Sequence, residues 1–248
     1  MTEKIFVDAS FYIALTNPRD QHHSWASVRS SAMKDSALLD YYARRAQEYE
    51  QIYEKPERQR ELALLKAHLI KLLAGREVLE VACGTGYWTA LLAPFTRSMC
   101  ATDAAAEVLD VARAKAYPPG RVRFEQADAY TLDAVAGDFN GGLAGFWWSH
   151  IQKSRQADFL KNFHGRLQAG AMAVLIDNQY VEGSSTPISG ADEDGNTYQE
   201  RRLADGSQHR VLKNFPTEAE LRDALGEAGA DIRFVDFTYY WCLSYTLV

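Results

Sequence analysis

Apolar runs and polar segments alternate along most of this chain at spacings typical of strands and helices. Short apolar runs bounded by turn residues predict strands at residues 76–82, 97–102, 121–126, 139–146 and 172–177. Between them, apolar residues three and four positions apart predict helices that reach about residue 93 and that cover residues 105–116 and 154–167. Strands that alternate with helices predict an α/β fold built on a mostly parallel sheet.

Two further helices are expected before the first of these strands. Ser36 can cap a helix whose apolar residues continue at helical spacing to Ile52 or Tyr53. A second helix is expected to begin after Pro56 and to end near Gly75.

The segment 178–216, which follows the strand at 172–177, is long and polar. Loops of this length inside a compact domain are commonly functional. Asp205-Gly206 lies between two strand-like stretches and predicts a hairpin. We therefore expect this insertion to form a lid or a wall of a substrate site.

The end of the chain predicts one helix and two strands. Thr217 and Glu220 fit a capping box for a helix at 218–228. Residues 231–237 and 239–246 then predict an antiparallel pair at the edge of the sheet.

The most informative stretch runs from Val78 to Thr89, where a predicted strand meets Gly84 and Gly86 and then a helix. Glycine has no Cβ and adopts positive φ readily, so a ligand can approach such a loop closely. The helix that follows offers free backbone N–H groups. Glu80, at the end of the strand, would repel a phosphate and suits a ligand that carries an ammonium group.

The pattern Glu80-x-x-x-Gly84-x-Gly86 resembles the first motif of the class I S-adenosylmethionine-dependent methyltransferases. The resemblance covers roughly residues 37–248 and assigns a methyltransferase domain to 36–248, with the lid at 178–216. It implies a Rossmann-like seven-stranded sheet, mostly parallel with an antiparallel last strand, and helices on both faces. It also implies S-adenosyl-L-methionine as the cofactor and S-adenosyl-L-homocysteine as the product.

The same resemblance assigns cofactor contacts along the chain. Asp103 ends the second strand, where an acidic side chain of a doubly wound sheet reaches ribose hydroxyls. Asp128 matches the adenine-edge position, and a segment around Tyr42 is similar to one that closes over the cofactor. The candidate cofactor-binding residues are Tyr42, Arg45, Glu80, Ala82, Cys83, Gly84, Gly86, Asp103, Ala104, Asp128, Ala129, Phe146 and Trp147.

The reaction expected is direct in-line transfer of a methyl group to an oxygen, nitrogen or carbon atom of a small-molecule acceptor. A base helps where the acceptor must lose a proton. His150 is the first candidate for that base, and Asp177 is another. The candidate substrate contacts are Trp148, His150, Tyr180 and His209.

The amino-acid composition limits the classes of partner that the protein is expected to bind. A net charge of -6 argues against a nucleic-acid surface. The three cysteines have no metal-ligand spacing and are expected to be thiols in a reducing cytoplasm, so no metal is predicted. No apolar run approaches the length of a membrane span. A homodimer is possible.

Residues 1–35 differ from the rest of the chain. The stretch around Asp8 resembles the first strand and helix of a PIN-type ribonuclease, in which this aspartate binds a divalent metal. One carboxylate does not make a metal site, so the expected state is a fused fragment without nuclease activity. The alternatives to a small-molecule methyltransferase are a cofactor-binding module without catalysis, a protein methyltransferase and a metal-dependent ribonuclease.

Overall fold

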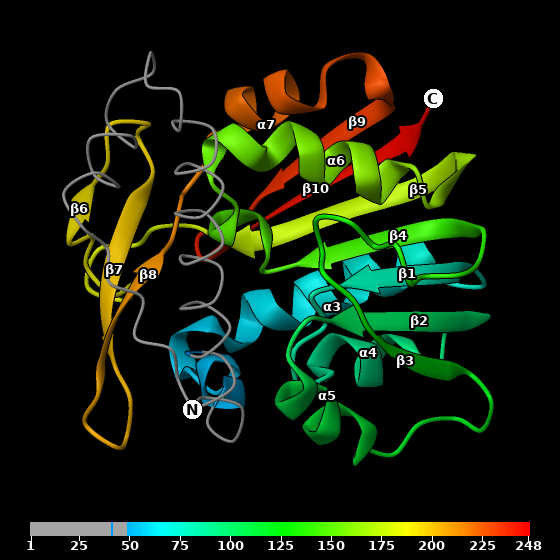
Figure 1. Cartoon of the computed structure of the whole chain (residues 1–248), viewed down its shortest axis with the longest axis horizontal. Helices are drawn as coiled ribbons and strands as arrows, with labels where there is room; N and C mark the ends of the chain where they lie inside the picture. The colour runs from blue at the N-terminus through cyan, green and yellow to red at the C-terminus, as the bar shows by residue number, and fades with distance from the viewer. Residues whose placement is uncertain (1–40, 42–48) are drawn as a thin grey trace, which may run out of the picture. The chain divides into compact units, whose positions relative to one another are not determined.

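The computed structural model describes Tyr41 and residues 49–248. Its main element is a seven-stranded sheet of order β3-β2-β1-β4-β5-β10-β9, in which β10 runs in the direction opposite to the other strands (Figure 1). The sheet confirms the predicted α/β, Rossmann-like architecture with an antiparallel last strand. The strands of this sheet are β1 (Glu77–Val81), β2 (Ser98–Asp103), β3 (Val122–Gln126), β4 (Phe139–Gly145), β5 (Leu167–Asn178), β9 (Gly229–Asp236) and β10 (Tyr240–Leu247).

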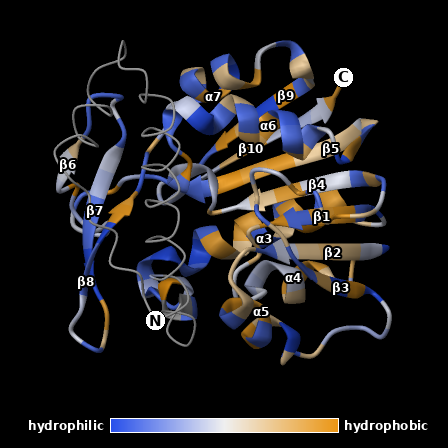
Figure 2. Ribbon diagram, in the orientation of Figure 1, coloured by the Kyte–Doolittle hydropathy of each residue, from blue (hydrophilic) through white to orange (hydrophobic). Residues whose placement is uncertain are grey.

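Helices cover both faces of the sheet, as predicted. One core packs α6 and α7 against the sheet, and a second packs α3 and α4 against it. Hydrophobic residues predominate in the central strands β1 and β5 of the main sheet, and the segment β6–β8 is largely hydrophilic (Figure 2). The described helices are α3 (Gln59–Leu73), α4 (Tyr87–Leu92), α5 (Ala106–Arg113), α6 (Gln156–His164) and α7 (Glu218–Leu225). Short 3-10 turns are η1 (Tyr49–Tyr53), η2 (Pro56–Arg58), η3 (Trp148–His150), η4 (Lys153–Arg155) and η5 (Gly226–Ala228).

The insertion 178–216 folds into a separate three-stranded sheet, β6 (Gly190–Ala191), β7 (Thr197–Arg202) and β8 (Gln208–Leu212). Strands β7 and β8 pair antiparallel around the predicted Asp205-Gly206 turn, which confirms the hairpin. The Thr217–Glu220 capping box at the start of α7 is also present. Figure 1 shows the small sheet facing the carboxyl ends of β4 and β5.

Two boundaries differ from the prediction. Residues 49–53 form a 3-10 turn where an α-helix was predicted. The strand predicted to begin at Met172 begins at Leu167, because Leu167 pairs with Phe139 before an irregularity that ends at the Gly141–Met172 pair. In the described part of the chain, no helix has the length and apolar character needed to cross a membrane.

Candidate functional site

The loop after β1 is held in an unusual backbone conformation. Ala82, Gly84 and Gly86 all have positive φ, at 54°, 56° and 75°. A Cβ added to Gly84 would meet nothing within 4 Å, so this part of the loop is open to a ligand. A Cβ added to Gly86 would lie 2.7 Å from the hydroxyl of Tyr117 and 2.9 Å from the Cβ of Ala112. Gly84 therefore leaves room for a ligand, and Gly86 allows the loop to pack closely on α5.

Asp103 connects the ends of β1 and β2. Its Oδ2 accepts a hydrogen bond from the Gly84 amide at 2.9 Å, and its Oδ1 accepts one from the Ala105 amide at 3.0 Å. Burial raises the pKa of Asp103, and these amides oppose the rise. Each carboxylate oxygen has a second lone pair, so the side chain keeps acceptor capacity for a hydroxyl group.

Glu80 lies beneath this loop with 2% of its surface exposed. Its Oε2 accepts a hydrogen bond of 2.6 Å from the hydroxyl of Thr89 on α4. Burial raises the pKa of Glu80 to about 7, against the lowering effects of Thr89 and Lys115. A cation bound at this carboxylate would stabilise its charged form.

The loop is also contacted from η1. Glu50 accepts a hydrogen bond of 2.7 Å from the hydroxyl of Thr85 and forms an ion pair with Lys115 at the end of α5. Tyr42 and Arg45, which were predicted to close over the cofactor, lie outside the described residues. The PIN-like stretch 1–35 also lies outside them and stays a prediction.

The remaining predicted cofactor positions follow β3 and β4. The Ala127 amide donates to the Asp103 carbonyl, which places Asp128 and the buried Ala129 next to the end of β2. Phe146 has a φ of 59° and stacks on Trp88. The indole Nε1 of Trp147 is buried and has no hydrogen-bond partner in the described chain, so it can donate to a bound group. Cys83 and Ala104 lie within the same loops.

A second group of polar side chains lies where β4 and β5 end. Lys213 forms an ion pair of 2.7 Å with Asp177 and donates to the hydroxyl of Ser149 at 2.5 Å. The Ser149 amide donates to the other oxygen of Asp177 at 3.0 Å. Asp177, a candidate base in the sequence, is therefore not an unpaired carboxylate: the Lys213 ammonium, which opposes the effect of burial, holds the pKa of Asp177 below its usual range.

His150 is buried in the same region. Its Nδ1 lies 2.7 Å from the carbonyl oxygen of Leu212, which can only accept, so Nδ1 carries the proton. Burial and the nearby cations Lys213 and Arg201 keep the pKa of His150 well below its usual value. The imidazole is therefore neutral at pH 7, with a weakly basic Nε2.

The other candidate substrate residues are not brought together. Tyr180 is 39% exposed and its ring packs against Phe215. His209 lies on β8 with its Nε2 2.9 Å from the hydroxyl of Ser207. Trp148 is 1% exposed and contacts Phe159 in the core, and it also lines a cavity of about 330 Å³ beside α7.

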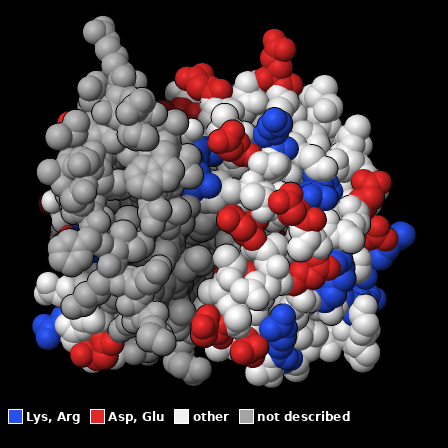
Figure 3. Space-filling model, viewed as in Figure 1, with Lys and Arg blue, Asp and Glu red and all other residues white. Residues whose placement is uncertain are grey.

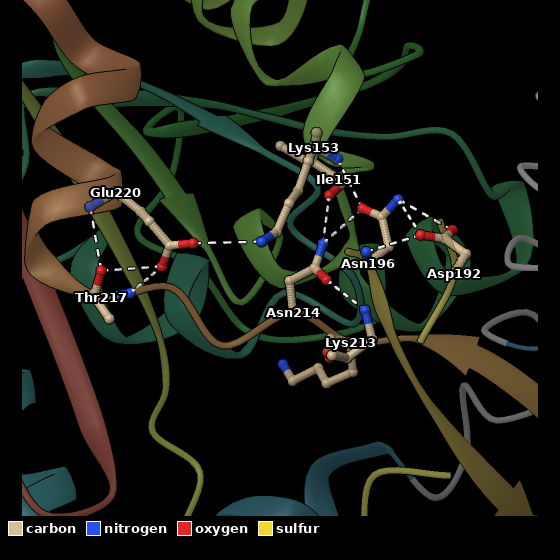
Figure 4. Close-up of polar contacts among 9 residues, drawn as sticks. Ile151, Lys153, Asp192, Asn196, Lys213, Asn214, Thr217 and Glu220 are labelled. Atoms are coloured by element: carbon tan, nitrogen blue, oxygen red, sulfur yellow. Dashed lines mark hydrogen bonds and ion pairs between the residues drawn. The ribbon is translucent and has the colours of Figure 1, made fainter. Parts of the chain in front are cut away.

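Two buried asparagines attach the small sheet to the main domain (Figure 4). Asn214 donates to the Ile151 carbonyl at 3.0 Å and accepts from the Thr197 amide at 2.9 Å. Asn196 accepts from the Lys153 amide at 2.8 Å. These hydrogen bonds hold the backbone next to Lys213 and thereby position the Lys213 ammonium at the end of β5.

The sequence did not single out Lys213 and Ser149 as site residues. It also did not single out Arg58, which donates a hydrogen bond to the side chain of Asn178 at the end of β5. Lys213 comes from the insertion, and its pairing with Asp177 depends on how the small sheet packs. One feature of the sequence did point to Lys213: it ends the strand-like stretch that follows the predicted Asp205-Gly206 turn. Among the described residues, no group of three or more His, Cys, Asp or Glu side chains is placed to hold a metal ion. On the face in Figure 3, the visible Lys and Arg side chains are interspersed with Asp and Glu.

Comparison with known proteins agrees with this geometry. Residues 78–170, a little over a third of the chain, match the model of the family described as Methyltransferase domain. A comparison with curated proteins gives no match. The seven-stranded sheet is the fold of class I methyltransferases.

Three solved structures illustrate the likeness. The DhpI-SAM-HEP complex is 24% identical, with a TM-score of 0.69, and the match covers 86% of this chain and 97% of that one. The DhpI-SAH complex is also 24% identical, with a TM-score of 0.65 and coverage of 86% and 96%. An S-adenosylmethionine-dependent methyltransferase from Clostridium acetobutylicum is 17% identical, with a TM-score of 0.56 and coverage of 81% and 98%. Together with the family match, these structures support S-adenosylmethionine as the cofactor.

Proposed function

We propose that this protein is an S-adenosylmethionine-dependent methyltransferase that acts on a small-molecule acceptor. The observation that carries the proposal is the joining of the open Gly84 loop to Asp103, with Glu80 beneath the loop. The family match at residues 78–170 includes all three residues. The names of the DhpI structures record SAM and SAH as ligands of that protein, which supports the same cofactor here.

The chain's residues fit each part of this cofactor. The acceptor capacity of Asp103 suits the ribose hydroxyls, and Glu80 suits the ammonium of the methionine moiety. Just after β4, Trp147 has a buried N–H that forms no hydrogen bond within the described part of the chain. When bound, S-adenosylmethionine supplies a methyl group activated on a sulfonium, so the protein's main task is to place the acceptor in line with it.

The region that places the acceptor lies at the carboxyl ends of β4 and β5, where open α/β sheets bind ligands. His150 presents a neutral imidazole there, and its Nδ1 proton is donated to the Leu212 carbonyl. Because Nδ1 carries the proton, Nε2 is the basic nitrogen of this imidazole. Because its pKa is low, we expect its contribution as a base to be small.

The test is isothermal titration with S-adenosyl-L-homocysteine, followed by a methyl-transfer assay on a panel of alcohols, phenols, amines and acids. Micromolar binding with turnover supports the proposal. Binding without turnover on any acceptor favours a cofactor-binding module without catalysis. Failure to bind would contradict the proposal.

A further inference from the structure

Two buried cations contact consecutive residues at the carboxyl end of β5. The side chain of Lys213 reaches Asp177, and the guanidinium of Arg58 reaches the next residue, Asn178. Lys213 is 4% exposed and Arg58 is 6% exposed. Arg58 is close enough to lower the pKa of Lys213, with burial as the larger cause. Buried cations without enough compensating charge are costly.

The partners of Arg58 are neutral. Its Nη2 donates to the hydroxyl of Ser184 at 2.9 Å, and its Nη1 donates to the Oδ1 of Asn178 at 3.3 Å. Its guanidinium also lies 5.0 Å above the ring of Tyr239. Among the residues that the structure describes, no carboxylate oxygen forms an ion pair with Arg58.

Two acidic groups near Arg58 form no ion pair with it in the described part of the chain. Glu57 accepts a hydrogen bond from the hydroxyl of Ser184, the same hydroxyl that Arg58 binds, and Glu61 accepts hydrogen bonds from the amides of Thr238 and Tyr239. Asp177 is already matched by Lys213. Glu57 is exposed and Glu61 is half-buried, so among the described residues the two buried cations of this region, Lys213 and Arg58, face one buried carboxylate, Asp177.

Lys213 and Arg58 lie at the edge of the sheet where a methyl acceptor is expected to bind. Ser149, which binds the Lys213 ammonium, follows β4, and Asn178, which binds Arg58, ends β5. Strand β4 pairs with β1, which leads into the glycine loop, so both regions lie at the same edge of the sheet. Ligands of open α/β sheets bind at this edge.

We infer that the methyl acceptor carries an anionic group, a carboxylate or a phosphate, which binds Arg58 and Lys213. The inference rests on the proposed function and specifies its substrate class. A guanidinium can hold either oxyanion through two parallel hydrogen bonds. Lys213 adds a point charge from the insertion, so the small sheet contributes directly to acceptor recognition.

The experiment uses the full chain and three probes: inorganic phosphate, sulfate and acetate. Each is titrated calorimetrically at constant ionic strength, with chloride as the reference, in the presence and absence of S-adenosyl-L-homocysteine. We expect saturable binding of at least one probe. Tighter binding of phosphate or sulfate would indicate a phosphate-like acceptor, and tighter binding of acetate would indicate a carboxylate acceptor. Arg58→Gln should weaken this binding about 30-fold, because it removes one partner of a buried charge pair.

Arg60→Gln is the matched control, since Arg60 is exposed in the first turn of α3, directly after the turn η2 that carries Arg58, and should leave anion affinity unchanged. Affinity for S-adenosyl-L-homocysteine should change by less than about threefold in both variants, because Arg58 binds neither the glycine loop nor Asp103. If Arg58→Gln does not fold, a crystal of the wild-type protein grown in ammonium sulfate replaces it. Sulfate within hydrogen-bond distance of Arg58 and Lys213 is expected there.

Absence of saturable binding by all three probes would overturn the inference, as would equal anion affinity in Arg58→Gln and Arg60→Gln or a sulfate-free site in the crystal. In each case, retained binding of S-adenosyl-L-homocysteine would leave the proposed function intact. If the wild-type protein bound an anion but did not bind S-adenosyl-L-homocysteine, that result would instead contradict the proposed function alone.

Discussion

The Asp103 carboxylate at the end of β2 accepts a hydrogen bond of 2.9 Å from the Gly84 amide after β1. This contact holds the glycine loop against the neighbouring strand and orients the carboxylate toward the sheet edge. Asp103→Ala should therefore weaken binding of S-adenosyl-L-homocysteine by at least about tenfold, because it removes both a ribose acceptor and the support of the loop. Isothermal titration measures the change.

Asp110→Ala provides the control for Asp103. Asp110 lies on α5 with its side chain 77% exposed and pairs only with Arg113 at the surface. Exposed pairs of this kind contribute little, so its affinity should match the wild type. Equal affinity in Asp103→Ala and the wild type would show that Asp103 does not bind the cofactor.

The two glycines of the loop should respond differently to alanine. Gly84→Ala introduces a methyl group into open space at a φ of 56°, at a conformational cost of about 1–2 kcal/mol. Gly86→Ala places its methyl group 2.9 Å from the Cβ of Ala112 in addition to a similar strain. We expect Gly84→Ala to lose mainly cofactor affinity and Gly86→Ala to lose mainly stability.

Urea unfolding and titration with S-adenosyl-L-homocysteine, performed on both variants, separate these effects. Gly86→Ala should lower the free energy of unfolding by about 2–4 kcal/mol, because strain and overpacking add. If Gly84→Ala bound the ligand as tightly as the wild type, the ligand would not approach this part of the loop.

The sequence was sufficient to predict the sheet because short apolar runs such as those of β1 and β5 alternate with helical patterns and are bounded by turn residues. The Asp205-Gly206 hairpin and the Thr217 cap were also predictable, since each depends on residues close together in the sequence. The glycine loop and Asp103 were found for the same reason, as a motif and a strand end.

The acceptor region was not predictable in the same way. Lys213 and Asp177 are separated by 36 positions, and Arg58 and Asn178 by 120. Their contacts depend on how the insertion and the turn η2 pack against the ends of β4 and β5. For this reason Asp177 was a candidate base in the sequence, whereas its charge is compensated by Lys213 in the structure.

Glu80 should make cofactor binding depend on pH. Burial places its pKa at about 7, so a large share of the free protein carries a neutral Glu80 at pH 6. A bound ammonium group favours the carboxylate and lowers this pKa. Affinity for S-adenosyl-L-homocysteine should therefore rise from pH 6 to pH 8, with proton release on binding below pH 7.

The same group should affect stability in the opposite direction. The folded protein holds the Glu80 proton up to about pH 7, whereas the ordinary value is 4.5. Its contribution to stability is therefore fully present below pH 4.5 and is lost as the pH rises to 7, by up to about 3 kcal/mol. Glu80→Gln should abolish both effects, measured by titration and by urea unfolding across this range. A pH-independent affinity in the wild type would contradict a role for Glu80 in binding the ammonium.

The buried ion pair of Lys213 and Asp177 should be sensitive to removal of one partner. Lys213→Met leaves the Asp177 carboxylate buried with the Ser149 and Asn178 amides as its remaining donors. Stability at pH 7 should fall by about 3–5 kcal/mol, as is usual when one charge of a buried pair is removed. Urea unfolding measures this change.

The double variant Asp177→Asn/Lys213→Met tests whether the loss comes from the unpaired charge. Asparagine keeps an acceptor for the Ser149 amide but carries no charge, so the double variant should be more stable than Lys213→Met alone. Protonation of Asp177 should also rescue Lys213→Met, so its deficit relative to the wild type should shrink as the pH falls. A deficit that is the same at all pH values and in the double variant would mean that Lys213 stabilises the insertion by packing, and not by its charge.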